Sequence, residues 1–340
     1  MAGILLSGGG TGGHVFPCLA LIPELRVYFS DIWYMGGSGI EKEQAALHGI
    51  PFFEVESPKL VRKPTPKNLT VPFGLLKARG KAVDILKDLK PSVVFGKGGY
   101  ASLPAMLAAA KLGIPKIAHE SDFSLGLANK IAKAAGARII TAFPIGFETV
   151  GMPLRREIYF GNRENALKLM KDGYFERKPF LLVVGGSGGA AAINAAVYGA
   201  LESLLAKYNV IHIAGKGAEF KIRRKGYSEL KFSDSIWDLY VAADVVVSRS
   251  GATALAELSA LRKKAVLIPL PKGRSRGDQV ENAEYAKKFG AHVLNQEALN
   301  GKSLLAAVEK ALASPPMEEC LRDGREKIAL ICFEESKKRV

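Results

Sequence analysis

The chain has 340 residues, of which 48% are hydrophobic and 24% charged, and its formal net charge is +15 at pH 7. This length predicts two domains, and the average composition excludes disordered, collagen-like and coiled-coil proteins. No apolar run reaches the roughly 18 residues that a membrane-spanning helix needs, and the N-terminus lacks the pattern of a secretory signal. The three cysteines form no C-x-x-C pair, which argues against disulfides and a zinc site.

The positive charge points to an anionic partner. In the first half it is concentrated in Ser57–Lys90, which holds nine basic and two acidic residues. Basic and apolar side chains interleave there, which favours peripheral binding to an anionic membrane surface; a solvated basic loop is the alternative. The candidate membrane-facing residues are Lys63, Lys67, Phe73, Leu75, Leu76, Lys77 and Arg79. We expect no nucleic-acid partner, because single-stranded binding faces stack bases on several aromatic side chains and this window has one.

Short apolar runs alternate with helical stretches, which is typical of β-α-β units around a parallel sheet. The first set of expected strands is Gly3–Leu6, Ile32–Met35, Val93–Phe95, Lys116–Ala118 and Ile139–Thr141. The second set is Phe180–Val184, Val210–Ile213, Val245–Val247 and Val266–Ile268. The segment Ala142–Arg177 between the sets contains prolines and mixed charge. The sequence therefore predicts an α/β protein with two doubly wound parallel-sheet domains that face one another.

Four of the expected strands run into turns rich in glycine or serine, each followed by an expected helix. The turns are Gly8–His14, Gly96–Tyr100, Gly185–Ala190 and Ser248–Thr253. Each would aim backbone amides and a helix dipole at one spot, an arrangement that suits phosphate. The alternative is that the glycines only permit tight packing of strand against helix. Four such turns in a basic chain favour the phosphate interpretation.

Gly8, Gly10 and Gly13 have the G-x-G-x-x-G spacing of dinucleotide-binding proteins. Such proteins need an acidic residue after the second strand to hold the ribose, and glycine and serine follow Met35 instead. We therefore expect no nicotinamide or flavin cofactor. The absence of G-x-x-x-x-G-K-[ST] also disfavours a P-loop enzyme.

Residues Gly185–Gly189 also match G-x-S-x-G, the nucleophile elbow of hydrolases. Asp244 and His292 follow in the order found in hydrolases. This interpretation is disfavoured because it leaves the first domain and its basic window without a role.

His14 ends the first glycine turn, at the N-terminus of an expected helix. A neutral imidazole can accept a proton from a substrate hydroxyl, and the helix dipole lowers its pKa and favours this neutral form. The alternative is a histidine that caps or packs. No two aspartates are two residues apart, so the D-x-D pattern is absent. We expect no metal, and a leaving diphosphate would be stabilised by helix dipoles, arginine and serine.

Seven blocks resemble, in the same order, those of the MurG family of glycosyltransferases (glycosyltransferase family 28). They are GGGTGGHVFP (Gly8–Pro17), GKGGY (Gly96–Tyr100), IPKIAHE (Ile114–Glu120), VGMPLR (Val150–Arg155), VVGGSGGA (Val183–Ala190), ADVVVSRSGATALAE (Ala243–Glu257) and DQVENA (Asp278–Ala283). The family transfers N-acetylglucosamine from its UDP conjugate to a lipid-linked muramyl pentapeptide in peptidoglycan synthesis. The resemblance implies an inverting enzyme without metal or other cofactor. It also implies a GT-B fold, in which two Rossmann-like domains face across a cleft.

The resemblance assigns residues 1–152 to an N-terminal domain that binds acceptor and membrane, and residues 153–324 to a C-terminal domain that binds the UDP sugar. A helix at about 325–340 would return to the first domain. The implied partners are UDP-N-acetylglucosamine, the lipid-linked muramyl pentapeptide and an anionic membrane surface, at the cytoplasmic face of the cell membrane. Two alternatives stay open: a GT-B glycosyltransferase for another lipid acceptor, and a nucleotide-sugar-binding module without catalysis.

Carried over position by position, the resemblance implies that His14 is the base that deprotonates the muramyl 4-hydroxyl. The implied donor-binding residues are Thr11, Gly12, Gly13, Asp122, Arg155, Ser187, Glu257, Gln279 and Asn282. Arg155 and Ser187 would hold the diphosphate, and Glu257 the ribose hydroxyls. Gln279 and Asn282 would hold the sugar. The implied acceptor-side residues are Tyr100, Glu120 and Asn129.

The sequence departs from the family pattern in four places. The family's H-E-Q-N is H-E-S-D at residues 119–122 here, and its V-G-N-P is V-G-M-P at residues 150–153. Gly188 replaces the glutamine of G-S-Q-G, and Ser233 stands where the family has an apolar residue on the uracil side.

Overall fold

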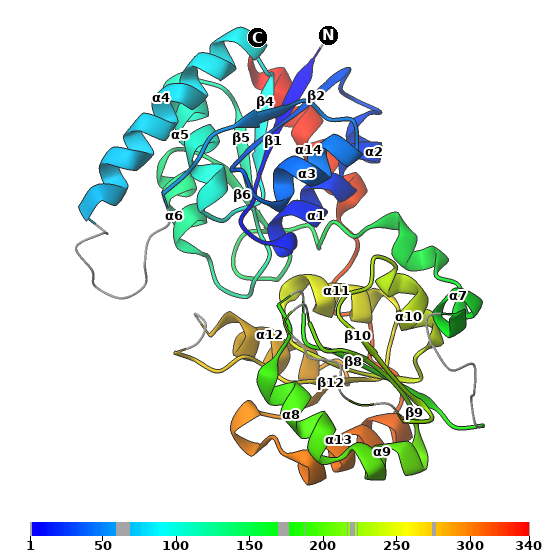
Figure 1. Ribbon diagram of the computed structural model, residues 1–340. Coiled ribbons are helices and arrows are strands. Elements are labelled where there is room, and N and C mark those ends of the chain that lie inside the picture. Colours follow the sequence, from blue (N-terminus) through cyan, green and yellow to red (C-terminus); the bar gives the residue numbers. More distant parts are fainter. Residues whose placement is uncertain are drawn as a thin grey trace. The chain divides into compact units, whose positions relative to one another are not determined.

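A computed structural model describes residues 2–58, 69–168, 177–186, 188–215, 217, 222, 224–273 and 277–339. The chain divides into two compact units (Figure 1). Unit 1 consists of Met1–Arg155 and Asp323–Val340, and unit 2 consists of Arg156–Arg322. The roles that the sequence assigns to the two domains stay predictions.

Unit 1 is built on a seven-stranded sheet in which all neighbouring strands are parallel. Its strands are β1 (Gly3–Ser7), β2 (Asp31–Gly36), β3 (Phe52–Glu54), β4 (Val93–Gly96), β5 (Lys116–Glu120), β6 (Arg138–Thr141) and β7 (Glu148–Thr149). Their order across the sheet is β3-β2-β1-β4-β5-β6-β7. The five expected strands are confirmed, and the additional β3 and β7 lie at the two edges.

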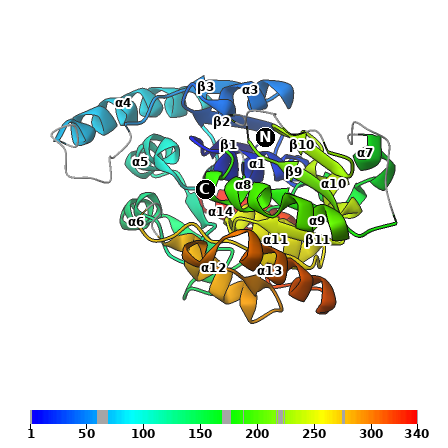
Figure 2. The same ribbon diagram turned by 60° about the horizontal axis from the view of Figure 1, so that its bottom comes forward.

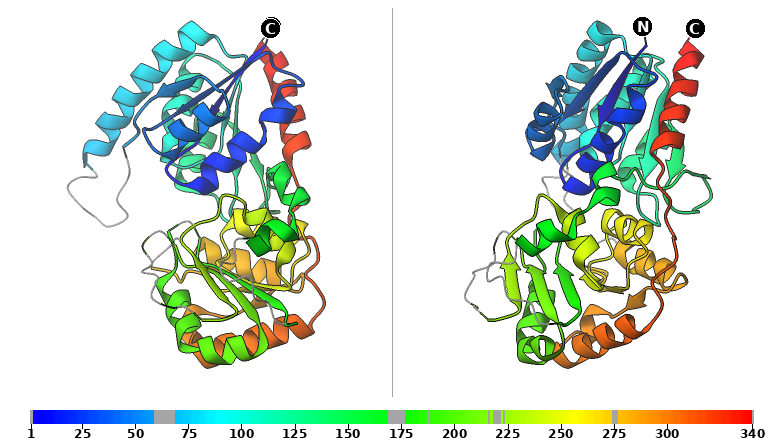
Figure 3. Two further views of the ribbon diagram at one scale, coloured as in Figure 1. Left: turned by 45° about the vertical axis from the view of Figure 1, so that its right-hand side comes forward. Right: turned by 90° about the vertical axis from the view of Figure 1, so that its right-hand side faces the viewer.

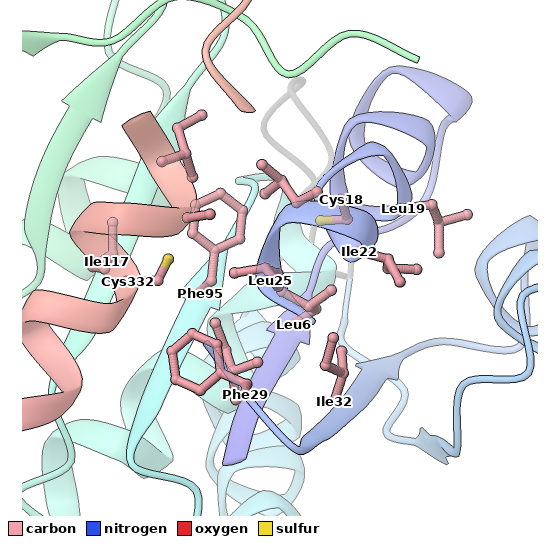
Figure 4. Close-up of a cluster of buried hydrophobic side chains, with 14 of the residues drawn as sticks. Leu6, Cys18, Leu19, Ile22, Leu25, Phe29, Ile32, Phe95, Ile117 and Cys332 are labelled. Atoms are coloured by element: carbon pink, nitrogen blue, oxygen red, sulfur yellow. The ribbon is translucent and has the colours of Figure 1, made fainter. Parts of the chain in front are cut away.

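Helices cover both faces of this sheet, so the central strands are apolar on both sides. One face carries α1 (Gly12–Ala20), α2 (Ile22–Leu25) and α14 (Arg325–Ser336), whose side chains pack with Ile4 and Leu6. Figure 4 shows this cluster, with Cys18 of α1 and Cys332 of α14 among its residues. The other face carries α4 (Val71–Leu89), α5 (Leu103–Lys111) and α6 (Leu127–Ala134), and it buries Leu5 (Figure 2). The helix α3 (Ile40–Leu47) packs beside α1.

The last helix, α14, belongs to unit 1 although it follows the whole of unit 2 in the chain (Figure 3). Met152 and Asp323 form a parallel bridge, and the Gly324 amide donates to the Met152 carbonyl over 2.9 Å. Arg325 forms an ion pair of 3.2 Å with Glu24 of α2. These contacts fix the start of α14 beside the segment where the chain leaves unit 1.

Unit 2 repeats the design with a six-stranded sheet whose neighbouring strands are all parallel. Its strands are β8 (Phe180–Val184), β9 (Asn209–Ile213), β10 (Tyr227–Leu230), β11 (Val245–Ser248), β12 (Ala265–Leu267) and β13 (His292–Val293). Their order is β10-β9-β8-β11-β12-β13. The four expected strands are confirmed, and β10 and β13 again are added at the edges.

Helices also cover both faces of the second sheet (Figure 3). One face carries α8 (Ala191–Gly199), α9 (Leu201–Lys207) and α13 (Gly301–Ala313). The other carries α10 (Ile236–Ala242), α11 (Ala252–Ala260) and α12 (Asp278–Lys287). The short α7 (Arg163–Lys168) packs against α10.

The strand order of each sheet reverses direction at its first strand, between β1 and β4 in unit 1 and between β8 and β11 in unit 2. Ligands of such folds bind beyond the carboxyl ends of the strands at this switch point. The four glycine-rich turns of the sequence follow these same four strands. The fold therefore places two of the turns together at the switch point of each unit.

Candidate active site

In unit 1, the turns after β1 and β4 are in contact at the switch point. Gly99 has φ +74°, and a Cβ atom there would lie 3.4 Å from the Gly9 carbonyl oxygen and 3.5 Å from Nδ1 of His14. The His14 ring thus lies directly against the backbone of the second turn. A side chain at Gly99 would strain the backbone and crowd the imidazole.

His14 lies in the first turn of α1, and Thr11 is the N-cap residue of that helix. The Thr11 hydroxyl and Nδ1 of His14 are 3.0 Å apart. This contact fixes the ring orientation and assigns Nδ1 to Thr11. When Nδ1 carries the proton and donates it to the hydroxyl, the lone pair of the imidazole is on Nε2.

A buried carboxylate, which the sequence analysis missed, holds the first turn. Glu41 of α3 is only 2% exposed. Its Oε1 accepts from the Gly37 amide over 3.1 Å, and its Oε2 accepts from the Gly10 amide over 3.4 Å. A Cβ atom on Gly9 would lie 2.3 Å from Oε1, so only glycine fits there. The Gly10 amide therefore already has an anionic partner, and the phosphate interpretation does not hold for that group.

The loop between β5 and α6 is organised by Glu120 and Asn129, both buried. The Glu120 carboxylate accepts from the amides of Ser121, Asp122 and Gly126 over 3.0, 3.2 and 2.8 Å. It also accepts from Nδ2 of Asn129 over 2.9 Å. Glu120 and Asn129, both predicted on the acceptor side, are thus hydrogen-bonded to each other and shape the loop.

The turn after β4 links this loop to His14. A Cβ atom on Gly98 would lie 3.2 Å from Nδ2 of Asn129, while Gly99 lies against His14. Tyr100 follows at once and is half-buried. The structure therefore brings His14, Tyr100 and the Glu120 loop together within unit 1.

Arg155 is the last residue of this part of unit 1. Its guanidinium lies over the Phe16 ring, 5.3 Å from the ring centroid. Phe16 follows His14 by two residues in α1, so Arg155 also lies at this side of the unit. The ring face attracts the cation and contributes to the placement of Arg155.

In unit 2, the turn after β8 packs against the chain that follows β9. Gly189 has φ +75°, and a Cβ atom there would lie 2.4 Å from the Ala214 carbonyl oxygen. Asn194 of α8 donates to the same oxygen over 2.9 Å. This close approach fixes the turn ahead of α8. Ser187, predicted to hold the diphosphate, lies outside the described residues.

The turn after β11 is tied to α12 through Ser250. The Ser250 hydroxyl donates to the Gln279 carbonyl oxygen over 2.7 Å, and Asn282 Nδ2 donates to the Ser250 carbonyl over 3.1 Å. The Gln279 side chain accepts from the Leu270 amide over 3.0 Å. Asn282 is fully buried. The structure brings these two predicted sugar-binding residues together, and their contacts hold α12 in place; the sugar contact stays a prediction.

Glu257 lies on α11 and is also buried. It accepts from the Tyr240 hydroxyl over 3.2 Å. The neighbouring Arg249, which sequence reasoning did not single out, donates to the Ile268 carbonyl over 3.0 Å and to Gln296 Oε1 over 2.7 Å. Arg249 thus joins the ends of β11 and β12 to a third loop.

Among the described residues, no group of three or more His, Cys, Asp or Glu side chains is arranged to hold a metal ion. No helix in that part of the chain is both long and apolar enough to span a membrane. Residues 1, 59–68, 169–176, 187, 216, 218–221, 223, 274–276 and 340 lie outside both findings.

The first turns of α4 present apolar side chains to solvent. Phe73 is 74% exposed and Leu76 is also exposed, and their spacing of three residues places them on one face of α4. Leu69, just ahead of the helix, is exposed too. Lys77 is exposed, and Leu75 and Arg79 are half-buried. Lys63 and Lys67 lie outside the described residues.

Comparison with known proteins agrees with this two-unit design. The Glycosyltransferase family 28 N-terminal domain matches residues 4–141, and the Glycosyltransferase family 28 C-terminal domain matches residues 180–328. The chain belongs to glycosyltransferase family 28. As a family 28 glycosyltransferase it has the GT-B class of fold, with a parallel α/β sheet in each domain.

Two curated relatives are similar over most of their length, and both carry the name UDP-N-acetylglucosamine–N-acetylmuramyl-(pentapeptide) pyrophosphoryl-undecaprenol N-acetylglucosamine transferase. The protein from Clostridium botulinum (strain 657 / Type Ba4) is 42% identical over 318 residues, which cover 90% of this chain and 89% of the relative. The protein from Lachnospira eligens is 41% identical over 326 residues, or 92% of each chain.

A solved structure of Acinetobacter baumannii MurG has a TM-score of 0.73 and 24% sequence identity to this chain. The match covers 98% of this chain and 100% of the other. This likeness supports the family fold.

Proposed function

We propose that this chain transfers N-acetylglucosamine from UDP-N-acetylglucosamine to the 4-hydroxyl of a lipid-linked muramyl pentapeptide, with inversion at the anomeric carbon. The observation that carries the proposal is the 41–42% identity to relatives named for this reaction, over about nine-tenths of the chain. The four glycine turns at the two switch points agree with it, because each unit offers a ligand site at the carboxyl ends of its strands.

His14 is the proposed base. In the proposed tautomer Nδ1 of His14 donates a hydrogen bond to the Thr11 hydroxyl 3.0 Å away, and the lone pair on Nε2 receives the proton of the attacking hydroxyl as the glycosidic bond forms. Removing this proton during attack avoids a positively charged oxygen in the transition state. Thr11, a predicted donor-binding residue, acts here by holding the base.

The leaving group is UDP, and negative charge develops on its β-phosphate as the bond to the sugar breaks. The turn after β8 leads directly into α8, whose first residue is Ala191. Amides at such a helix N-terminus stabilise an anion without a metal. Ser187 and Arg155 are the proposed side-chain partners of the diphosphate, and Glu257 of the ribose.

On the acceptor side, Tyr100 is the proposed direct contact, because it is half-buried and follows the turn that packs on His14. Glu120 and Asn129 have their polar atoms engaged within the loop. Their proposed role is to hold the backbone of this loop in the shape that receives the muramyl peptide.

Peripheral membrane binding through the start of α4 completes the proposal. Because α4 follows β3 in a parallel sheet, its first turn lies toward the carboxyl ends of the strands, at the edge that carries the glycine turns (Figure 1). Exposed Phe73 and Leu76 beside Lys77 suit insertion among anionic headgroups. The proposed location is the cytoplasmic face of the cell membrane, where UDP sugars meet lipid-linked acceptors.

The acceptor assignment is tested by offering the purified protein UDP-N-acetylglucosamine with either a short-chain lipid-linked muramyl pentapeptide or diacylglycerol. We expect disaccharide product and UDP release with the muramyl acceptor only, at a rate that EDTA leaves unchanged. Turnover with diacylglycerol alone would indicate a glycolipid synthase. Donor binding without turnover on either acceptor would indicate a binding module.

A further inference from the structure

A buried lysine lies beneath the acceptor-side loop. Lys97 is the second residue of the turn after β4, and it is only 1% exposed. Its ammonium group donates a hydrogen bond to the Ser121 hydroxyl, across 24 residues of sequence. Lysine is rarely buried unless its charge has a partner, so the surroundings of this side chain must compensate for the lost hydration.

Groups from three elements face Lys97. Cys18 faces it from α1, Glu120 from β5, and Asp122 from the loop after β5. Burial lowers the pKa of Lys97 to about 8, while the charges of Glu120 and Asp122 act in the opposite direction. Burial also raises the pKa of Cys18 to about 12, so its thiol is neutral near pH 8. Burial and the nearby Lys97 charge hold the pKa of His119 well below its usual value, so His119 is a neutral neighbour.

Lys97 also supports the turn that carries His14. A Cβ atom on Gly8 would lie 3.1 Å from Cβ of Lys97. The lysine is thus enclosed between the first glycine turn and the loop that Glu120 shapes. At 1% exposure its ammonium group cannot touch a substrate, and any effect on catalysis has to pass through these two backbone segments.

We propose that Lys97 is a positioning residue for acceptor binding, whose ammonium group holds Ser121 and thereby the loop between β5 and α6 in its binding shape. The inference rests on the proposed function. It also accounts for the two departures from the family's H-E-Q-N pattern. Ser121 supplies a short hydroxyl that accepts from the ammonium group, and Asp122 supplies a negative charge that balances it.

The first test compares steady-state kinetics of Lys97→Met with Lys111→Met, which removes an exposed lysine at the end of α5. We expect Lys97→Met to raise the acceptor KM about tenfold and to raise the donor KM less, because Glu257, Gln279 and Asn282, proposed to hold the donor, belong to unit 2. Lys111→Met should match the wild type. An unchanged acceptor KM in Lys97→Met would overturn the proposal.

The pH profile separates a charge effect from a packing effect. In the wild type we expect kcat/KM for the acceptor to fall as the pH rises through about 8, when Lys97 loses its proton. Lys97→Arg should retain activity and move this fall to higher pH, because guanidinium stays charged. Asp122→Asn should move it to lower pH, because a stabilising negative charge is lost. A pH profile that is the same in the wild type, Lys97→Arg and Asp122→Asn would contradict the proposal.

Hydrogen exchange tests the positioning role without any enzymatic turnover. It therefore separates a failure of this inference from a failure of the proposed function. Lys97→Met should speed amide exchange at Ser121, Asp122 and Gly126 and leave exchange in β8 and β11 as in the wild type. Unchanged exchange in the loop would overturn the positioning role. If Lys97→Met does not fold, Ser121→Ala removes the acceptor of the same hydrogen bond and should show the same loop-specific exchange.

Discussion

The hydroxyl of Thr11 lies 3.0 Å from Nδ1 of His14, within the first turn of the same helix. A side chain at this distance orients the imidazole, and when Nδ1 donates to the hydroxyl the lone pair of the ring is on Nε2. The proposed base and the hydroxyl that orients it thus lie within four consecutive residues, 11–14.

Replacing Thr11 with valine keeps the shape of the side chain and removes the hydroxyl. We expect Thr11→Val to lower kcat by roughly 10- to 100-fold, because the imidazole loses the hydroxyl that orients it. Thr11→Ser keeps a hydroxyl and should keep most of the activity. Steady-state kinetics decide the matter: a change in donor KM with an unchanged kcat would point to donor binding instead.

The Glu41 carboxylate bridges two glycine turns from a buried position. Glu41→Gln puts an NH2 group against one of two backbone amides that donate to it, and we expect a loss of about 1–3 kcal/mol in the free energy of unfolding. Glu43→Gln, on the exposed side of the same helix, should change it by less than about 0.5 kcal/mol. Urea unfolding measures both, and equal midpoints would contradict the bridging role.

Two neighbouring glycines of the turn after β8, the proposed diphosphate site, differ in their surroundings. Gly189 has positive φ, and a Cβ atom would collide with the Ala214 carbonyl, whereas nothing lies within 4 Å of a Cβ atom on Gly188. Gly189→Ala should therefore cost about 1–3 kcal/mol of stability and weaken UDP binding. Gly188→Ala should unfold at the wild-type denaturant concentration. Calorimetric UDP titration and urea unfolding test the pair, and similar losses in both variants would count against this account of the turn.

Membrane binding is attributed to the exposed apolar start of α4. Phe73→Asp should reduce the fraction of protein that sediments with anionic vesicles several-fold, because a charge replaces an inserting ring. Leu47→Asp is the matched control, since Leu47 on α3 is 72% exposed and Phe73 74%. Equal sedimentation of the two variants would contradict the assignment of membrane contact to the start of α4.

The lowered pKa of Lys97 predicts that rising pH affects the stability of the protein in the opposite direction to its activity. Its pKa is about 8 in the folded protein against 10.5 without burial. Between these pH values the unfolded chain binds more protons, so the contribution of Lys97 to stability rises with pH. From pH 8 to 10, the unfolding free energy of the wild type should therefore increase relative to that of Lys97→Met. Parallel pH curves for the two proteins would show that Lys97 keeps an ordinary pKa.

The central strands could be predicted from the sequence because both of their faces are buried and their residues are continuously apolar, as in β1 and β8. The edge strands could not. β3 has three residues, all half-buried, and β7 has two, both exposed, so both strands are too short and too exposed to show the buried apolar run of a central strand. Such strands are defined by pairing with a neighbour, which the local pattern does not record.

The candidate site divides in the same way. His14 and the glycine turns are visible in the sequence because strand, turn and helix follow one another along the chain. Glu41 and Lys97 were missed because their partners are 31 and 24 residues away. Only the fold shows that these charged residues are buried and which segments of the chain they contact.

The central claim is most directly tested by single-turnover transfer of radiolabelled N-acetylglucosamine to the lipid-linked muramyl pentapeptide by the wild type and by His14→Ala. We expect a β-linked disaccharide from the wild type, and a rate lower by roughly 10²- to 10⁴-fold in the variant with unchanged affinity for UDP-N-acetylglucosamine. Transfer by His14→Ala at the wild-type rate would contradict the account.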